Sequence, residues 1–302
     1  MELQPISPFV QHIFRKYEAM RPCFMSEGHF LNQFLWENYY QTRFATDDIA
    51  LYLFFQRKGE RGAFCPLCSV DDLPEAFHRM EQQFHEVWNC PMNVYLIDTL
   101  TKDVWQSAGL LSHYTLESDR DSADYIYESE KLATLSGKKL HGKRNHINKF
   151  KALYEDRWSY EVMTRDNVED CFQMALQWRD QNGCEEDPHK RSEICVTMNA
   201  LRLFEELELR GGVLRVDGKV VAFTLGEPVC SDTFVVHIEK AFAEVEGAYS
   251  MINQQFVEHE CRDFLYVNRE EDTGAEGLRK AKLSYRPVFL VEKGNVKEAE
   301  TE

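Results

Sequence analysis

The sequence lacks the long apolar runs and the cysteine framework that mark membrane-spanning and small secreted proteins. Its longest apolar run is IALYLFF, from Ile49 to Phe55, far short of the roughly 18 residues that a membrane-spanning helix needs. The opening MELQPISPFV has no charged and apolar signal-peptide pattern. Nine cysteines, an odd number without regular spacing, favour free thiols in a reducing compartment. We therefore expect a cytoplasmic protein.

A second absence concerns metal ligands. Cys65 and Cys68 form the only CxxC pair, and a structural zinc ion needs two further ligands. The nearest candidates, His78, His85 and Cys90, lie in or beside a stretch with strong helical periodicity and form no second knuckle. The sequence therefore predicts no metal site.

Basic residues are outnumbered, since 35 Lys and Arg stand against 51 Asp and Glu, and the net charge of -16 disfavours bulk attraction to nucleic acid or anionic membranes. One segment is the exception: Lys131 to Lys151 holds seven basic residues and no acidic one. As a helix over 139–154 it would separate a basic face from an apolar one. We expect a phosphate-bearing partner here, contacted by Lys139, Lys143, Arg144, His146 and Lys149. The alternative is a basic helix docked on an acidic neighbour surface.

With 302 residues, 43% of them hydrophobic, the chain is nearer two domains than one. Its patterns mix strands with helices, which indicates an α/β or α+β fold, and they start again at Trp158. We expect domains at 1–150 and 151–302. Helices are expected at 9–19, 71–88, 139–154, 168–181, 199–210 and 249–260, and strands at 49–56, 62–68, 93–98, 158–164, 211–218, 219–227, 232–241, 263–270 and 287–293.

The stretch NREEDTGAEGLRKAKLSYRP, from Asn268 to Pro287, crowds opposite charges around a turn with two glycines. Thr273 and Glu276 have the spacing of a capping box. The following helix would carry Arg279 and Lys282 on a face away from its apolar stripe. A solvated amphipathic helix and the wall of an active site both fit this pattern.

This stretch, together with YIYESEKLATLSGKKLHGKRNHINKF, resembles the signature blocks of the phosphatidylglycerol lysyltransferase C-terminal domain family. The resemblance implies a pair of GNAT-type acyltransferase domains, related to the Fem transferases. It further implies transfer of an aminoacyl group from aminoacyl-tRNA to the headgroup of phosphatidylglycerol, without another cofactor.

Two departures qualify this expectation. Acetyl-CoA enzymes of the GNAT type carry a [QR]xxGx[GA] loop whose N–H groups hold pyrophosphate. Here FAEVEGAYSMIN retains only Gly247 and Ala248 and adds Glu244 and Glu246, which makes coenzyme A the less favoured donor. In family members that act on lipid, this module usually follows a multi-span membrane domain in the same chain. Two acceptors therefore stay open: a lipid headgroup, reached peripherally at the membrane surface, or another small molecule.

Aminoacyl transfer passes through a tetrahedral oxyanion, which the site must stabilise. We expect Lys282 and Arg279 to stabilise that charge or a phosphate, and Glu270, Glu271 or Asp272 to act as base or to bind the amino group. His237, Glu239 and Lys240 lie on the strand expected to wall the cleft. The amides of Asn253 and Asn268 and the ring of Tyr285 are candidate substrate contacts.

Three functions therefore compete. The first is an aminoacyl-tRNA-dependent transferase, the second an acyl-CoA-dependent N-acetyltransferase on the same fold, and the third a non-catalytic module that binds tRNA or a metabolite. The amino acid, the acceptor and the oligomeric state are not encoded in any of these patterns.

Overall fold

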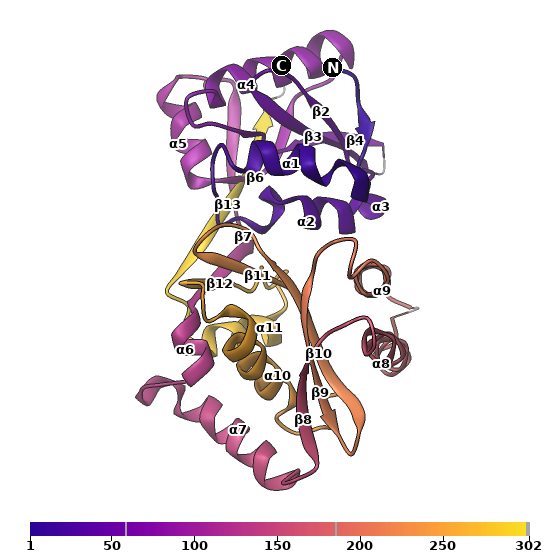
Figure 1. Ribbon diagram of the computed structural model, residues 1–302. Coiled ribbons are helices and arrows are strands. Elements are labelled where there is room, and N and C mark those ends of the chain that lie inside the picture. Colours follow the sequence, from indigo (N-terminus) through magenta and orange to yellow (C-terminus); the bar gives the residue numbers. More distant parts are fainter. Residues whose placement is uncertain (58, 185, 300–302) are drawn as a thin grey trace. The chain divides into compact units, whose positions relative to one another are not determined.

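The computed structural model describes residues 1–57, 59–184 and 186–299, which form two compact units (Figure 1). Of the described residues, unit 1 takes those within 1–124, 271–274 and 290–299, and unit 2 takes those within 125–270 and 275–289. No helix within the described ranges is long and apolar enough to cross a membrane.

Unit 1 is a mixed sheet with helices packed on it. Its core gathers Phe54, Phe77 and Trp105, and the buried positions of α4, Leu73, Ala76, Phe77 and Met80, follow the helical period. β4 and β6 are parallel. Along the sheet the strands are β1 (Gln4–Pro5), β2 (Arg43–Thr46), β3 (Ala50–Arg57), β4 (Glu60–Phe64), β6 (Asn93–Asp98) and β13 (Phe289–Glu298), with β5 (Leu67–Cys68) paired to β3; the helices are α1 (Gln11–Glu18), α2 (Phe30–Leu35), α3 (Glu37–Tyr40), α4 (Leu73–Gln82) and α5 (Thr99–Ser107).

Unit 2 is built around a second run of strands, with α8 and α9 on one side and α10 on the other (Figure 1). Among the pairings described for this unit, β11 with β12 is parallel and the others are antiparallel. In order the strands are β7 (Tyr114–Glu128, beginning in unit 1), β12 (Tyr266–Asn268), β11 (Thr233–Ala241), β10 (Lys219–Pro228), β9 (Arg210–Val216) and β8 (Trp158–Val162); the helices are α6 (Ser129–Thr134), α7 (His141–Leu153), α8 (Val168–Gln181), α9 (Pro188–Arg202), α10 (Ala248–Phe256) and α11 (Glu276–Ser284).

Short helical turns complete both units. They are the 3₁₀ turns η1 (Pro8–Val10), η2 (Ser26–Gly28) and η4 (Lys138–Leu140), and the π-turns η3 (Gln83–Val87) and η5 (Val257–Cys261).

The expected α/β class is confirmed, but the division at 150/151 needs correction. Residues 125–150 group with unit 2 because Ile126 and Tyr127 pair with β12 and α7 packs on α10. Residues 290–299 group with unit 1 because β13 pairs with β6 and buries Val296 in that core. The basic helix α7 therefore opens the second unit instead of ending the first.

One local expectation fails, and one strand was not expected. The helix expected at 199–210 ends at Arg202 and begins earlier, at Pro188, where proline suits a first helical turn. The later apolar residues Phe204 and Leu207 are buried, but they lie in turns. Strand β7 was not foreseen because its first half, rich in Asp and Glu, is mostly exposed and shows no apolar alternation.

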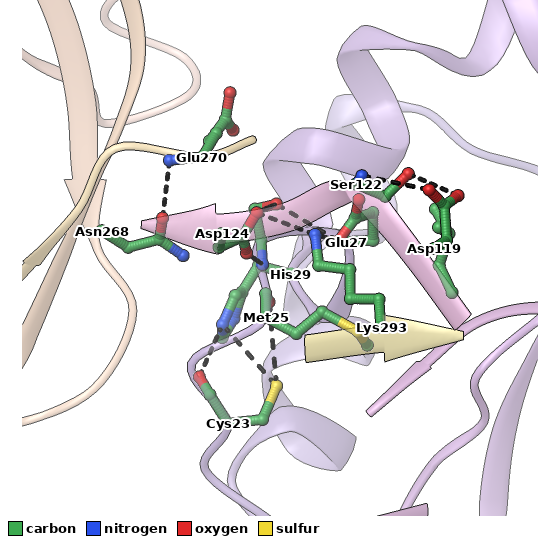
Figure 2. Close-up of polar contacts among 12 residues, drawn as sticks. Cys23, Met25, Glu27, His29, Asp119, Ser122, Asp124, Asn268, Glu270 and Lys293 are labelled. Carbon is green, nitrogen blue, oxygen red and sulfur yellow. Dashed lines mark hydrogen bonds and ion pairs between the residues drawn. The ribbon is translucent and has the colours of Figure 1, made fainter. Parts of the chain in front are cut away.

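A buried lysine ties β13 to the rest of unit 1 (Figure 2). The Lys293 ammonium is fully enclosed and contacts the carboxylates of Glu27 and, at 2.8 Å, Asp124. Asp124 also accepts from the Ser26 N–H at 2.8 Å. Burial raises the pKa of Glu27, and the charge of Lys293 opposes that rise. Because each ion is out of water, each depends on its partners.

We predict that Lys293→Met destabilises the protein by about 3 to 5 kcal/mol, since it leaves two buried carboxylates without their cation. Urea denaturation measures the loss. The matched control is Lys297→Met on the same strand, which removes an ion pair to Glu117 that is partly exposed and is worth about 0 to 1 kcal/mol. Equal losses in both variants would contradict a special role for the buried cluster.

Candidate functional site

The parallel strands β11 and β12 of unit 2 are paired at only three positions. Thr233–Val235 pair with Tyr266–Asn268, and β12 ends there. The chain then turns at Glu270, whose φ of 57° is left-handed, while β11 continues to Ala241. His237 and Glu239 therefore lie beyond the last pair, where the two strands part.

A buried ion pair lies at this opening. Arg269, the first residue after β12, donates from Nη2 to Oε1 of Glu239 at 2.9 Å, and 11% and 14% of the two side chains are exposed. The Asn253 amide on α10 donates to the other Glu239 oxygen at 3.2 Å. This donation orients the amide so that its own oxygen points away from the carboxylate.

Aromatic rings and a second cation surround the pair. The Arg269 guanidinium lies 4.9 Å from the centroid of Tyr285 and 5.8 Å from that of Tyr127. The Lys143 Nζ lies 4.0 Å from the Tyr285 centroid, in a cation–π geometry. Burial, and secondarily the charge of Arg269, lowers the pKa of Lys143 to about 8. This lysine can therefore change charge near neutral pH, which exposed lysines do not do.

Two enclosed polar atoms of this group have no hydrogen-bond partner among the described residues: Nη1 of Arg269 and Oδ1 of Asn253. Burial raises the pKa of Tyr285, and the charge of Arg269 and a side-chain hydrogen bond to it oppose that rise. Nη1 of Arg269 nevertheless has no hydrogen-bond partner of normal geometry among the described residues. A buried donor and a buried acceptor left unpaired cost free energy in a stable fold. Together they form a matched pair of sites for a polar ligand.

The family follows from comparison with known proteins. The family model described as phosphatidylglycerol lysyltransferase, C-terminal, matches residues 22–293. The chain belongs to this family. The resemblance seen in its signature blocks is thereby confirmed, and it extends over most of unit 1 as well.

Two solved structures match nearly the whole chain, and a curated protein matches part of it. A conserved protein of unknown function from Bacteroides thetaiotaomicron is 34% identical, with a TM-score of 0.89 and 99% of both chains covered. L-PGS from Bacillus licheniformis is 15% identical, with a TM-score of 0.68, 99% of this chain and 94% of that one covered, a likeness that concerns the fold. An uncharacterized protein of Mycoplasmoides gallisepticum is 26% identical over 190 residues, which are 62% of this chain and 60% of that protein.

More distant structural neighbours share the fold. A tandem GNAT protein from the clavulanic acid biosynthesis pathway is 7% identical with a TM-score of 0.50, covering 100% of this chain and 99% of that one. FemX is 9% identical with a TM-score of 0.50, at 99% and 98% coverage. The expected tandem GNAT-like fold is confirmed, and the likeness to FemX is one of fold. Family and fold together point to transferase activity.

Within the family stretch Asn268 to Pro287, several predicted residues serve the turn that carries Arg269. Lys282 is buried, and its ammonium donates to the main-chain oxygens of Arg269 at 2.5 Å and Glu270 at 3.1 Å. Asn268 accepts from the Glu270 N–H at 2.6 Å (Figure 2). The proposed stabilisation of an oxyanion by Lys282 stays a prediction, whereas its contacts hold Arg269 in place.

The rest of the stretch divides between the units. Glu271 and Asp272 belong to unit 1, where Asp272 is buried and its Oδ2 lies 3.6 Å from Arg120. The expected capping box is wrong: the N-cap is Ala275, with no side-chain hydrogen bond, and Glu276 pairs with Lys280 at 2.6 Å. Arg279 is half-buried on α11, and its role stays a prediction.

His237 lies between two carboxylates. Its ring nitrogens are 2.7 Å from Glu270 and 3.4 Å from Glu227, and 4% of its side chain is exposed. Burial alone would lower the pKa of His237, but the charge of Glu270 and hydrogen bonds to both carboxylates raise it to about 10. The imidazolium keeps both protons at neutral pH, so it acts as a positioning group for Glu270 and is poorly suited to accept a proton.

The neighbouring Lys240 points to the other face of β11. It is buried, pairs with Glu193 and lies 4.1 Å from the centroid of Trp178. Its predicted contact with substrate is untested.

The basic segment is largely helical, as expected, but its cations do not gather on one face. Arg144 donates to the main-chain oxygens of Leu135 and, at 2.7 Å, Gly137. Lys149 pairs with Glu246 at 2.5 Å, as the docked-helix alternative proposed. Lys139 and His146 are exposed, and Lys143 faces Tyr285. Phosphate binding by these five residues stays a prediction.

Sequence reasoning missed Arg269 and Tyr127. Both lie inside the two signature blocks, and Arg269 directly precedes three acidic residues that carry the opposite charge. A metal site was not expected, and among the residues that the structure describes no group of His, Cys, Asp or Glu could hold a metal ion.

We predict that His237 makes stability fall as pH rises from about 6.5 to about 10. The unfolded histidine titrates near 6.5 and the folded one at about 10, so its contribution is complete below the first value and lost above the second. Urea denaturation between pH 6.5 and 10 should show a flatter dependence for His237→Gln than for wild type. The exposed His146→Gln should follow wild type, and parallel curves for all three proteins would refute this ion pairing.

Proposed function

We propose that the chain transfers an aminoacyl group from aminoacyl-tRNA to a small acceptor, a lipid headgroup of the phosphatidylglycerol type being the first choice. The observation that carries the proposal is the enclosed group at the β11 and β12 opening, with Nη1 of Arg269 and Oδ1 of Asn253 unpaired. The family assignment supports the aminoacyl donor, since its description names a lysyltransferase.

The reaction requires one bond to form and one to break. An acceptor oxygen or nitrogen attacks the ester carbonyl carbon, the bond from that carbon to the ribose oxygen breaks, the acceptor loses a proton and the ribose oxygen gains one. Negative charge gathers on the carbonyl oxygen during the attack. The free N–H of Arg269 suits that oxygen, and the free oxygen of Asn253 suits the ammonium of the aminoacyl group.

Lys143 is the candidate for the proton transfer. With its pKa lowered to about 8, a sizeable fraction of its amine is neutral at physiological pH and can take the acceptor's proton. Both unpaired atoms are enclosed, so binding requires a neighbouring side chain to move. Lys143 covers the Tyr285 ring and, as a long flexible side chain, is suited to this movement.

The start of α10 argues against coenzyme A as the donor. The N-cap Gly247 has a left-handed φ of 83°, and a Cβ added there would meet the main-chain oxygen of His146 at 2.8 Å and the Cβ of Phe150 at 3.0 Å. Helix α7 thus covers the position where a pyrophosphate would meet helix N–H groups. Nearby Glu246 would also repel it, although Lys149 pairs with this carboxylate.

The direct assay gives the protein labelled aminoacyl-tRNA or labelled acetyl-CoA, each with vesicles containing phosphatidylglycerol, vesicles of phosphatidylcholine alone, or a mixture of free amines. We expect product from aminoacyl-tRNA with phosphatidylglycerol. Product from acetyl-CoA alone would establish the acetyltransferase alternative. Binding of tRNA without any product would establish the non-catalytic one.

We predict that Arg269→Gln lowers the transfer rate about 100- to 1,000-fold, the usual effect of removing one donor to an oxyanion. Arg262→Gln is the matched control, because Arg262 forms partly exposed ion pairs with Glu130 and Glu258. Arg269→Gln also leaves the buried Glu239 without its cation, although the Asn253 amide still donates to it. The double variant Glu239→Gln/Arg269→Gln removes both charges, and a folded double variant with full activity would refute the assignment.

We predict that the transfer rate rises with pH through about 8 as Lys143 loses its proton. Single-turnover transfer between pH 6.5 and 9, corrected for ester hydrolysis without enzyme, measures this rise. Lys143→Arg, which stays charged, should be slow and lack the rise, whereas Lys139→Arg, at an exposed position, should keep it. An unchanged profile in Lys143→Arg would exclude Lys143 as the base.

A further inference from the structure

A hollow of about 480 Å³ in unit 2 opens between the end of α8, the end of β11 and the start of α10. Its walls include the rings of Trp178 and Tyr249, the amides of Gln181 and Asn182, and the carboxylate of Glu244. The volume is that of a small-molecule site. None of the functions assigned above uses this hollow.

The two aromatic rings are held in place and are only partly covered. Lys240 lies over the Trp178 ring, 4.1 Å from its centroid. Tyr249 is 41% exposed, and its hydroxyl interacts with Trp178 and with the main chain of Ala241. Large aromatic side chains that are fixed yet exposed offer stacking surfaces instead of core contacts.

The hollow adjoins the proposed reaction site on two elements. Ala241 lies two residues beyond Glu239 on β11, hence on the same side of the strand and roughly 7 Å along it. Tyr249 and Asn253 lie four residues apart on α10 and so share one helix face. The hollow and the proposed reaction site thus share two elements, β11 and α10.

The polar lining selects for a neutral base. Among the described residues, the lining holds one carboxylate and two side-chain amides but no lysine or arginine. The nearby Lys240 is buried and paired with Glu193, so phosphate is disfavoured here. Glu244 accepts from Gln181 at 3.2 Å and retains lone pairs for an exocyclic amine. Amide groups read the edges of nucleobases, and aromatic rings stack on their faces.

We propose that this hollow binds the adenine of the 3′-terminal nucleotide that carries the aminoacyl ester, stacked against Trp178 and Tyr249. The inference rests on the proposed use of aminoacyl-tRNA. Glu244 accepts from the 6-amino group, and the ribose leads the ester toward Arg269. Specificity for the donor thus begins at a base that every aminoacyl-tRNA shares.

The test uses two RNA minihelices of one sequence, ending in A or in U, with and without a chemically attached amino acid. Binding of the uncharged RNAs is measured by fluorescence anisotropy and transfer from the charged ones by product formation. Wild type should prefer the A-ending RNA in both assays. Trp178→Ala and Tyr249→Ala should each weaken its binding about 5- to 150-fold, the range of base stacking on aromatic rings, and should abolish the preference.

Trp178→Phe should restore most of the binding, and Phe289→Ala, which removes a partly exposed ring elsewhere in unit 2, should behave as wild type. If Trp178→Ala does not fold, the exposed Tyr249→Ala decides. The assignment of the hollow is overturned if Trp178→Ala and Tyr249→Ala keep the full preference for the A-ending RNA, or if wild type shows no such preference. Transfer observed in the same experiment would still support the proposed function. If wild type prefers the A-ending RNA, the variants lose that preference and no protein transfers the amino acid from either RNA, adenine binding in the hollow is supported and the proposed function is contradicted.

Discussion

The buried pair of Glu239 and Arg269 is the interaction on which the site in unit 2 depends. One member comes from β11 and the other from the residue after β12, so the pair lies where two parallel strands stop being neighbours. Neither charge could be enclosed alone, because an unpaired buried ion costs several kcal/mol. Lys282 holds the Arg269 carbonyl and His237 holds Glu270. Three charged residues of the family stretch, Arg269, Glu270 and Lys282, thus serve a single turn.

This arrangement links stability to chemistry. A guanidinium that satisfies a carboxylate with one nitrogen and keeps another unpaired, as in Arg269, is already oriented before a substrate arrives. Its effect on a developing charge is large because the surrounding rings exclude water. The same enclosure lowers the pKa of Lys143. Low dielectric therefore supplies both the electrostatic stabilisation and the proton acceptor in the proposed reaction.

Much of the fold could be predicted from the sequence, because apolar periodicity survives in the buried elements. The β11 run and the α10 pattern are examples, and both are where they were expected. Strand β7 could not be foreseen, since its acidic half is exposed and its pairing depends on residues about 140 positions away. The burial of Lys282 and its contacts with main-chain oxygens could not be foreseen either. A lysine on the polar side of a helical pattern normally reaches solvent, and only the left-handed turn at Glu270 brings main-chain oxygens to its ammonium.

The most direct test of this account is a crystal structure of the protein with a 3′-aminoacyl adenosine whose ester is replaced by an amide that resists transfer. The account predicts the amide carbonyl oxygen within hydrogen-bonding distance of Arg269 Nη1, the amino group at Asn253 Oδ1 and the adenine against Trp178. A ligand bound elsewhere, with Arg269 and Asn253 still without contacts to it, would contradict the central claim that the opening between β11 and β12 receives the aminoacyl donor.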